Sequence, residues 1–246
     1  IALTGVQHAI GVSGRKPVPP LNLIGDFGGG GMLLAFGMVC ALLEARSSGE
    51  GQVVDAAMVD GASALMALFY SMPSRWHTPN RGENLLDGGA PFYGTYETSD
   101  GKHVSIGAIE PEFFELLIHH TGADKARFAD RMNRSKWPEL RSELARIFKS
   151  KTLHAWCEVM EATDACFAPV LSMEEAPHHP HNKERKGFVT LDGVTQPAPA
   201  PRFGRTHPQE PTPAPMPGSD TGAVLSDLGL SDAELRRLRA SGAIGG

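Results

Sequence analysis

The stretch NLIGDFGGGG, residues 22–31, and the twelve-residue apolar run that follows it at 32–43 decide the fold of this chain. Four consecutive glycines let another backbone or a ligand come close, and the residues after them are apolar on nearly every face of a helix. Ser47, Ser48 and Gly49 end the pattern. The pattern predicts a helix from Gly30 that is buried at the centre of its domain, and its apolar run is shorter than the ~20 residues that span a bilayer.

The residues after this helix predict a short strand at 52–57 and a second, largely apolar helix at 58–69. Two buried helices need a sheet to pack against, and the few strands predicted in this sequence cannot supply that layer. We therefore expect an α/β protein in which residues 1–75 are the C-terminal part of a larger domain. Residues 76–91 then form a connector.

Residues 92–194 are expected to form a smaller α+β domain. Ser99-Asp100-Gly101 between two alternating runs indicates a hairpin. Further elements are predicted by their periodicity: helices at 111–120, 137–148 and 152–162, and strands at 167–173 and 187–192. Residues 195–246 are expected to be a proline-rich return linker followed by a terminal helix, which Ser231 and Glu234 cap.

The composition excludes several classes of protein. Hydrophobic residues make up 41% and charged residues 21%, which are the values of a folded globular chain. A net charge of -5 gives no basic field for a phosphate backbone, so we expect no nucleic-acid partner. Three cysteines without a pairing pattern suit a reducing compartment, and the sequence begins at Ile1 without a secretory leader or a membrane span. We therefore expect a bacterial cytoplasmic protein, present here as a fragment, with no membrane partner.

Two carboxylates are candidates for chemistry. Asp26 would stand at a helix start, where it could act as proton acceptor or nucleophile while the amides of residues 26–29 hold a developing oxyanion. Its alternative is a simple helix-capping role. Glu110 lies between a predicted strand and a predicted helix, and the alternative to a chemical role is that its charge complements the helix dipole.

The loop RGENLLDGGAPFY, residues 81–93, could shape a pocket or form two turns without a ligand.

No metal site is predicted. Three histidines stand close together in the sequence, at His178, His179 and His181, but there is neither a His-Glu-x-x-His pattern nor a cysteine pair near them. A serine nucleophile is also not predicted, because no Gly-x-Ser-x-Gly occurs.

Six blocks together resemble the α-methylacyl-CoA racemases of the family III CoA-transferase superfamily. The blocks occur in the family's order and with similar spacing: LNLIGDFGGG at 21–30, GEGQVVDAAMVDG at 49–61, RGENLLDGGAPFY at 81–93, GAIEP at 107–111, TDAC at 163–166 and HNKER at 181–185. The resemblance implies the fold of that superfamily, in which residues 1–75 belong to a Rossmann-like CoA-binding domain. It also implies an interlocked homodimer.

The resemblance further implies an isomerase of lipid metabolism. Its reaction would epimerise 2-methylacyl-CoA thioesters by 1,1-proton transfer through an enolate. The resemblance implies no metal or redox cofactor, and CoA is part of the substrate. Asp26 matches the family's aspartate base, and Glu110 matches a glutamate that hydrogen-bonds a histidine base. The substrate-binding positions are expected at Asn22, Gly25, Phe27, Gly28, Leu86 and Tyr93.

That histidine belongs to a His-Asp-x-Asn-Tyr segment which would lie before Ile1, and His8 does not match it. Two alternatives therefore stay open. One is a family III CoA-transferase in which Asp26 is the nucleophile. The other is that this chain by itself is an inactive fragment or a binding module.

Overall fold

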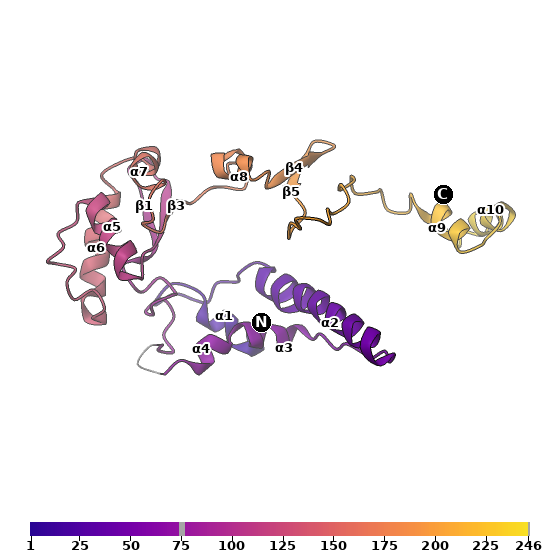
Figure 1. Ribbon diagram of the computed structural model, residues 1–246, viewed down its shortest axis with the longest axis horizontal. Coiled ribbons are helices and arrows are strands. Elements are labelled where there is room, and N and C mark those ends of the chain that lie inside the picture. Colours follow the sequence, from indigo (N-terminus) through magenta and orange to yellow (C-terminus); the bar gives the residue numbers. More distant parts are fainter. Residues whose placement is uncertain (74–76, 246) are drawn as a thin grey trace. The chain divides into compact units, whose positions relative to one another are not determined.

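The computed structural model describes residues 1–73 and 77–245, which form two compact units. The first unit is Ile1–Val170 and the second begins at Leu171 (Figure 1). The predicted boundary between residues 75 and 76 lies outside the described residues. The boundary between the two units, after Val170, lies before the predicted domain boundary at residue 194, and the hairpin of residues 188–197 belongs to the second unit.

The first unit opens with four helical elements. Short turns come first, η1 (Ala2–Thr4) and α1 (Val6–Ala9). The glycine-rich stretch then forms η2 (Leu23–Met32), a π-helix that continues into α2 (Leu33–Ser48). The helix therefore starts earlier than the sequence predicted. Gly49 ends α2 with a φ of 80°, the left-handed conformation that favours glycine at a helix end.

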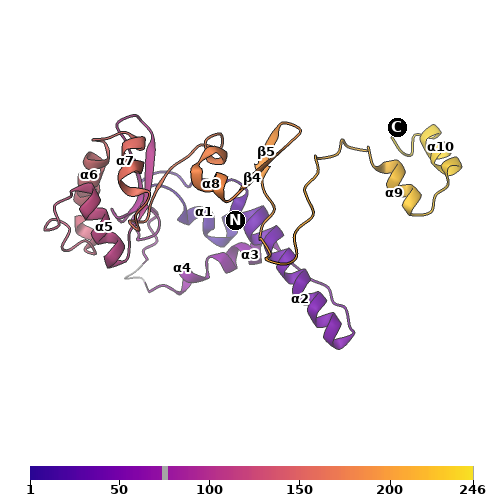
Figure 2. The same cartoon turned by 45° about the horizontal axis from the view of Figure 1, so that its top comes forward.

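The prediction that this helix is buried is wrong for the chain described. No residue of α2 is buried, and its large apolar side chains include Phe36, which is 66% exposed. The combined helix Leu23–Ser48 is 26 residues long and apolar enough to cross a membrane by length and composition, although the core helix of a larger domain passes the same test. Figures 1 and 2 show α2 as one long helix, and the chain that follows it runs back alongside it.

The predicted strand at 52–57 is also not formed among the described residues. This segment runs back along α2, where Val54 lies against Gly37, and it has no strand to pair with. Backbone groups need a neighbouring strand before an extended segment becomes a sheet. The second predicted helix is present but broken at Met66 into α3 (Met58–Leu65) and α4 (Ala67–Ser71).

The rest of the first unit is a small sheet covered by helices. The predicted hairpin is confirmed as β1 (Tyr93–Glu97) and β2 (His103–Gly107), and β3 (Phe167–Pro169) pairs antiparallel with β2. The helices are α5 (Pro111–Thr121), η3 (Arg134–Lys136), α6 (Trp137–Phe148) and α7 (Leu153–Met160).

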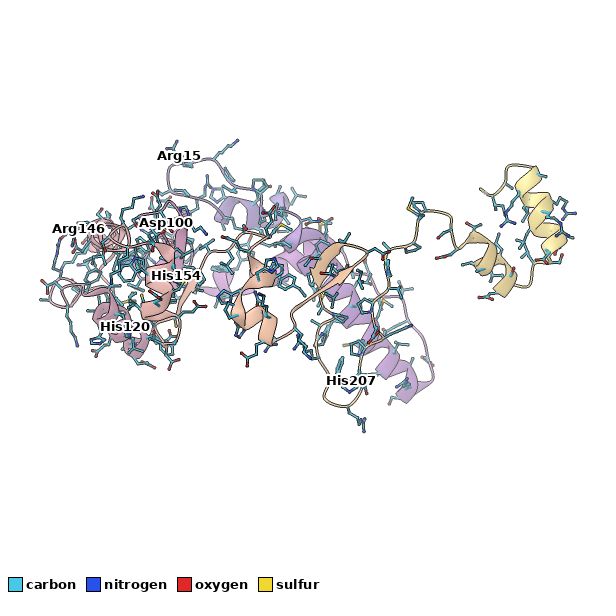
Figure 3. The ribbon with its side chains drawn as sticks, turned by 90° about the horizontal axis from the view of Figure 1, so that it is seen from above. Arg15, Asp100, His120, Arg146, His154 and His207 are labelled. Atoms are coloured by element: carbon cyan, nitrogen blue, oxygen red, sulfur yellow. The ribbon has the colours of Figure 1, made fainter. Side chains whose placement is uncertain are left out.

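These helices and strands enclose the main core. Phe92, Leu117, Leu144, Phe148 and Trp156 are almost fully buried in it. Figure 3 shows the side chains gathered densely in this part, with Arg146 at its edge. Because each helix turns one apolar face inward at helical spacing, the sequence pattern predicts this core well.

The second unit consists of short elements: η4 (Ala176–His178), α8 (Pro180–Glu184), the hairpin β4 (Phe188–Leu191) with β5 (Val194–Pro197), α9 (Thr221–Asp227) and α10 (Asp232–Ala240). The predicted cap of α10 is confirmed. Ser231 accepts the Glu234 N–H, and the Glu234 carboxylate accepts from Ser231 in return.

Candidate functional site

Asp26 lies in the first turn of η2, and its side chain is exposed. The Asn22 carbonyl before the helix accepts the Phe27 N–H at 3.2 Å, so that amide is already used by the helix. The predicted set of oxyanion donors at residues 26–29 is therefore wrong from Phe27 onward, and the Asp26 amide is the member of that set which precedes the first helical hydrogen bond. Because the helix begins at Leu23, the amides without a helical acceptor are those that precede Phe27. The Phe27 ring is 56% exposed beside Asp26 in the chain.

Glycines fix η2 against α3. A Cβ added to Gly61 would lie 1.8 Å from the Gly29 carbonyl oxygen, and one added to Gly29 would lie 2.6 Å from the Ala62 nitrogen. The two backbones are thus in direct contact where they cross. At Gly25 a Cβ would lie 3.1 Å from the Met58 sulfur, and at Gly28 it would lie 3.0 Å from the Leu23 carbonyl oxygen. The glycines of residues 22–31 allow close packing, and this packing holds the turn that carries Asp26.

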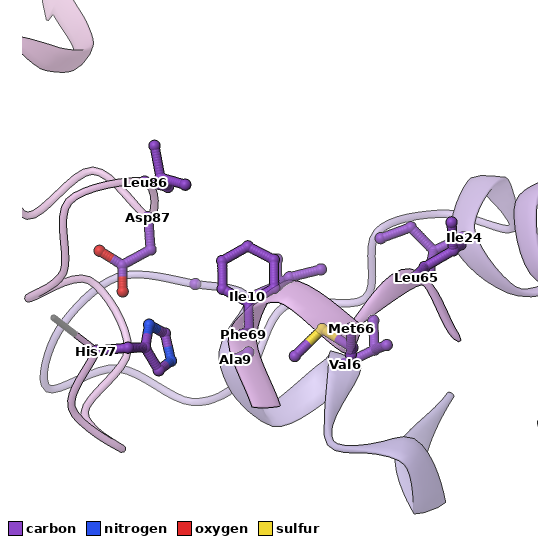
Figure 4. Close-up of a pocket in the computed structure, with 11 residues that line it drawn as sticks. Val6, Ala9, Ile10, Ile24, Leu65, Met66, Phe69, His77, Leu86 and Asp87 are labelled. Atoms are coloured by element: carbon purple, nitrogen blue, oxygen red, sulfur yellow. The ribbon is translucent and has the colours of Figure 1, made fainter. Parts of the chain in front are cut away.

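A cavity of about 430 Å³ lies beside the start of η2. Its lining is mostly apolar and includes Ile10, Ile24, Leu65, Phe69 and the predicted binding residue Leu86. Figure 4 shows His77 and Asp87 at one end and Ile24 with Leu65 at the other. Asp26 is not among the lining residues, although Ile24 stands two positions before it. An apolar cavity with a few polar groups at one end is typical of a small-molecule site.

The connector is ordered by one buried side chain. Asn84 is 2% exposed, its amide donates to the carbonyls of Thr78 and Asn80, and its side-chain oxygen accepts the Thr78 N–H at 2.7 Å. The Asp87 carboxylate accepts the N–H groups of Gly82 and Asn84, each at 2.7 Å. Residues 81–93 therefore form turns, one of the two possibilities given for this loop. The same turns direct Leu86 into the cavity.

The connector also joins the parts on either side of it. Arg81 donates to the carbonyls of His8 and Arg15, and Ser13 donates to Glu83 at 2.7 Å. His8 is therefore used through its backbone in a structural contact. On the other side, Arg141 on α6 donates to the carbonyls of Gly88 and Ala90.

Glu110 stands immediately before α5, with its side chain exposed and its backbone extended. Pro111 begins the helix, as its fixed φ and missing N–H favour. Cys166 lies nearby, and burial together with the charges of Glu110 and Asp164 raises the pKa of its thiol. Tyr93 is partly buried against the core, with its ring 3.7 Å from the Cβ position of Gly107.

The predicted site residues thus fall into two groups. Asn22, Gly25, Asp26, Phe27 and Gly28 lie on or directly before η2, and Leu86 lines the cavity beside it. Tyr93 packs against the core around the small sheet, and Glu110 lies exposed beside that core, immediately before α5. Within residues 1–73 and 77–245, no described cavity contains both Asp26 and Glu110.

Sequence reasoning missed two supporting residues. Gly61 ends the sequence block at 49–61, but its contact with Gly29 is visible only where α3 crosses η2 in the structure. Arg131 donates to the Ile109 carbonyl at 2.9 Å, and a single arginine in a loop carries no sequence pattern that predicts such a contact. In the described part of the chain, no group of three or more His, Cys, Asp or Glu side chains is placed to hold a metal. The predicted absence of a metal site stays a prediction.

Comparisons with known proteins identify the family of this chain. The family model for CoA-transferase family III matches residues 1–221. The chain is 44% identical to an alpha-methylacyl-CoA racemase of Mus musculus and 43% identical to one of Homo sapiens, in each case over 98% of this chain and 64% of the relative. The chain therefore spans less than two thirds of the length of these relatives.

A solved structure shows the same fold. It is a CAIB/BAIF family protein from Brucella suis, which matches with a TM-score of 0.67 at 19% identity over 92% of this chain and 61% of that one. The fold and the expected resemblance are thereby confirmed. With a family model matching most of its length and racemases as close relatives, this chain belongs to CoA-transferase family III.

Proposed function

We propose that the protein containing this chain epimerises 2-methylacyl-CoA thioesters at C2 by 1,1-proton transfer. The observation that carries the proposal is its 44% identity, over 98% of the chain, to an enzyme named as such a racemase. CoA-transferases of the same family are more distant, for example 27% identical for a succinyl-CoA–D-citramalate CoA-transferase of Chloroflexus aurantiacus. The reaction moves a proton and no electrons, so it calls for no redox cofactor.

The chemistry assigns a role to each group. The α-proton of a thioester is weakly acidic, so its removal needs a base on one face and donors for the enolate oxygen. We assign the role of base to Asp26, because its carboxylate is exposed and lies on a helix turn whose backbone is fixed by the glycine contacts with α3. The cavity that holds Ile24 and Leu86 is suited to the branched acyl chain, since its lining is largely apolar.

Glu110 is proposed to hold the second base, a histidine that the family carries in a His-Asp-x-Asn-Tyr segment. The 246 residues contain no such segment. Asp26 and Glu110 share no described cavity, which fits the family's interlocked dimer, where each belongs to a different active site. The dimer, the acyl-CoA substrate and the cytoplasmic location remain parts of this proposal.

The test is deuterium exchange at C2. The protein expressed from its complete reading frame is incubated with one epimer of a 2-methylacyl-CoA in deuterated water, and the C2 proton signal is followed by NMR. Asp26→Asn removes the base and keeps the size of the side chain. We expect a rate lower by about 10²–10⁴-fold, the usual contribution of a general base.

Asp60→Asn is the matched control, because Asp60 is also an exposed aspartate in the first turn of a helix and lies on α3, which packs against η2. It should leave the exchange rate unchanged. Wild-type protein that exchanges no deuterium but transfers CoA to an added carboxylic acid contradicts the racemase proposal. That result assigns Asp26 the role of nucleophile instead.

A further inference from the structure

The turn that presents Glu110 is fixed by backbone contacts on both sides. The Gly107 N–H donates to the Cys166 carbonyl at 2.9 Å, and the Ile109 N–H donates back to the Gly107 carbonyl at 2.9 Å. The Glu110 carbonyl accepts the Phe114 N–H at 2.9 Å, which begins α5. Glu110 therefore has an exposed side chain on a backbone that is held before and after it.

One acceptor in this turn is satisfied by a side chain from a distant loop. The carbonyl of Ile109, the peptide group that precedes Glu110, accepts from Nη2 of Arg131 at 2.9 Å. The Arg131 guanidinium carbon lies 4.8 Å from the centre of the Phe92 ring and 4.3 Å from that of the Phe114 ring. These two rings fix the plane of the guanidinium by cation–π contact.

The other terminal nitrogen of Arg131 is not used in the same way. Nη1 is buried and has no hydrogen-bond acceptor among the described residues. Burial lowers the pKa of Arg131, and the negative charge of Glu110 opposes that effect. A buried N–H group of a cation without an acceptor costs free energy, so its persistence calls for an explanation.

We propose that Arg131 is a positioning residue for Glu110. One nitrogen of its guanidinium holds the Ile109–Glu110 peptide group, and the other is kept for one oxygen of the Glu110 carboxylate. The second carboxylate oxygen is then directed away from Arg131 toward the group with which Glu110 works. The role in catalysis rests on the function proposed above, whereas the role in fixing the turn does not.

The first experiment tests the turn without any activity. Ile109-Glu110 is the one Ile-Glu pair of this sequence. Labelling with carbonyl-¹³C isoleucine and ¹⁵N glutamate therefore gives a single correlation that reports this peptide group. In Arg131→Met, which keeps an unbranched apolar side chain between the two rings, we expect this carbonyl signal to move upfield as the hydrogen bond is lost.

Arg127→Gln is the control, because Arg127 lies in the same loop region, is exposed and pairs with Glu139. It should leave the signal in place. An Ile109 carbonyl signal that is unchanged in Arg131→Met overturns the assignment of Arg131 to this turn.

The second experiment measures C2 deuterium exchange in the protein from its complete reading frame. Arg131→Met is expected to lower kcat at least tenfold while KM stays within twofold, and Arg131→Lys, which keeps the charge, should recover part of the loss. Adding Glu110→Gln to Arg131→Met should cost little more than either change alone, because both act through one carboxylate. Equal kcat in wild type and Arg131→Met, or losses that multiply in the double variant, contradict the proposal.

Melting curves of each variant separate unfolding from mispositioning, and Arg131→Lys serves if Arg131→Met does not fold. A wild-type protein without exchange activity counts against the proposed function alone. In that case the labelled carbonyl still decides whether Arg131 holds the turn.

Discussion

The region around Asp26 and the region around Glu110 are built in different ways. Glu110 stands at the edge of an aromatic core in which Phe92, Phe148 and Trp156 are almost fully buried. Asp26 stands on a helix whose continuation, α2, has no buried residue at all. Side-chain packing therefore stabilises the region that carries Glu110, and direct backbone contact between glycines stabilises the helix turn that carries Asp26.

The two regions gain their stability from different sources. A well-packed core gains stability from the apolar surface that it removes from water, so the Glu110 region has its own source of stability. The apolar side chains of α2 gain nothing while they are exposed, and a contiguous exposed apolar face marks a surface that another segment or chain covers. We expect mutations to affect the two regions separately.

The largest expected effect comes from the aromatic core. Trp156 is 1% exposed, packs on the Phe148 ring and donates its indole N–H to the Phe148 carbonyl at 2.8 Å. Trp156→Ala leaves a cavity and an unpaired carbonyl, and should lower the free energy of unfolding by about 3–5 kcal/mol. Urea unfolding followed by circular dichroism measures it.

The control for this change is His154→Ala, an exposed position on the same helix, which should be nearly neutral. Hydrogen exchange of the Phe27 amide then tests whether the two regions unfold separately. If Trp156→Ala speeds exchange at Phe27 as much as it does in α5, the two regions unfold as one unit and the distinction between them is wrong.

The next largest effect is expected in the Asp26 region. Gly61→Ala places a Cβ 1.8 Å from the Gly29 carbonyl oxygen, and neither backbone can give way without moving η2. Overpacking of this kind costs about 3 kcal/mol. Faster hydrogen exchange at the Phe27 amide and a lower melting temperature are the measurements.

Gly51→Ala is its control, since nothing lies within 4 Å of a Cβ at that position. A Gly61→Ala protein with wild-type exchange at Phe27 means that the glycine contact does not hold the turn of Asp26. The comparison between backbone contact and side-chain packing then fails.

The two regions also differ in how well the sequence predicts them. Around Glu110, the hairpin and the three helices are predicted correctly because local turn chemistry and apolar periodicity agree with the packing. Around Asp26, the predicted strand at 52–57 and the buried helix are wrong for the described chain, because both depend on a sheet that these residues do not supply. Asp26, Glu110 and Leu86 could be named from motifs, whereas Arg131 acts through a contact that no local pattern records.

A smaller effect is expected in the connector between the two regions. The two oxygens of Asp87 accept from Gly82, Gly89 and Asn84. Asp87→Asn replaces one acceptor by a donor and should cost about 1–2 kcal/mol. Asp55→Asn, outside the connector, is the control. Unfolding curves that superimpose for wild type and Asp87→Asn contradict a structural role for this carboxylate.

The smallest effect concerns pH and the surface of the Glu110 region. The hydrogen bond from Lys149, at 2.6 Å, lowers the pKa of Glu97 from its ordinary value, and the lysine charge lowers it further. A carboxyl group whose pKa is lower in the folded state contributes stability above its unfolded pKa and loses it as the pH falls through the folded pKa. Lys149→Met should therefore raise the pKa of Glu97 and make stability fall less between neutral and acid pH.

Because both side chains are about half exposed, solvent and salt keep this contribution small. NMR titration of the Glu97 carboxyl measures the shift, and His103 should still lower that pKa slightly in the variant. Lys125→Met is the matched control, because it removes the exposed partner of Glu115 and should raise the pKa of Glu115 alone. A Glu97 pKa that does not move in Lys149→Met assigns the shift to another cause than this ion pair.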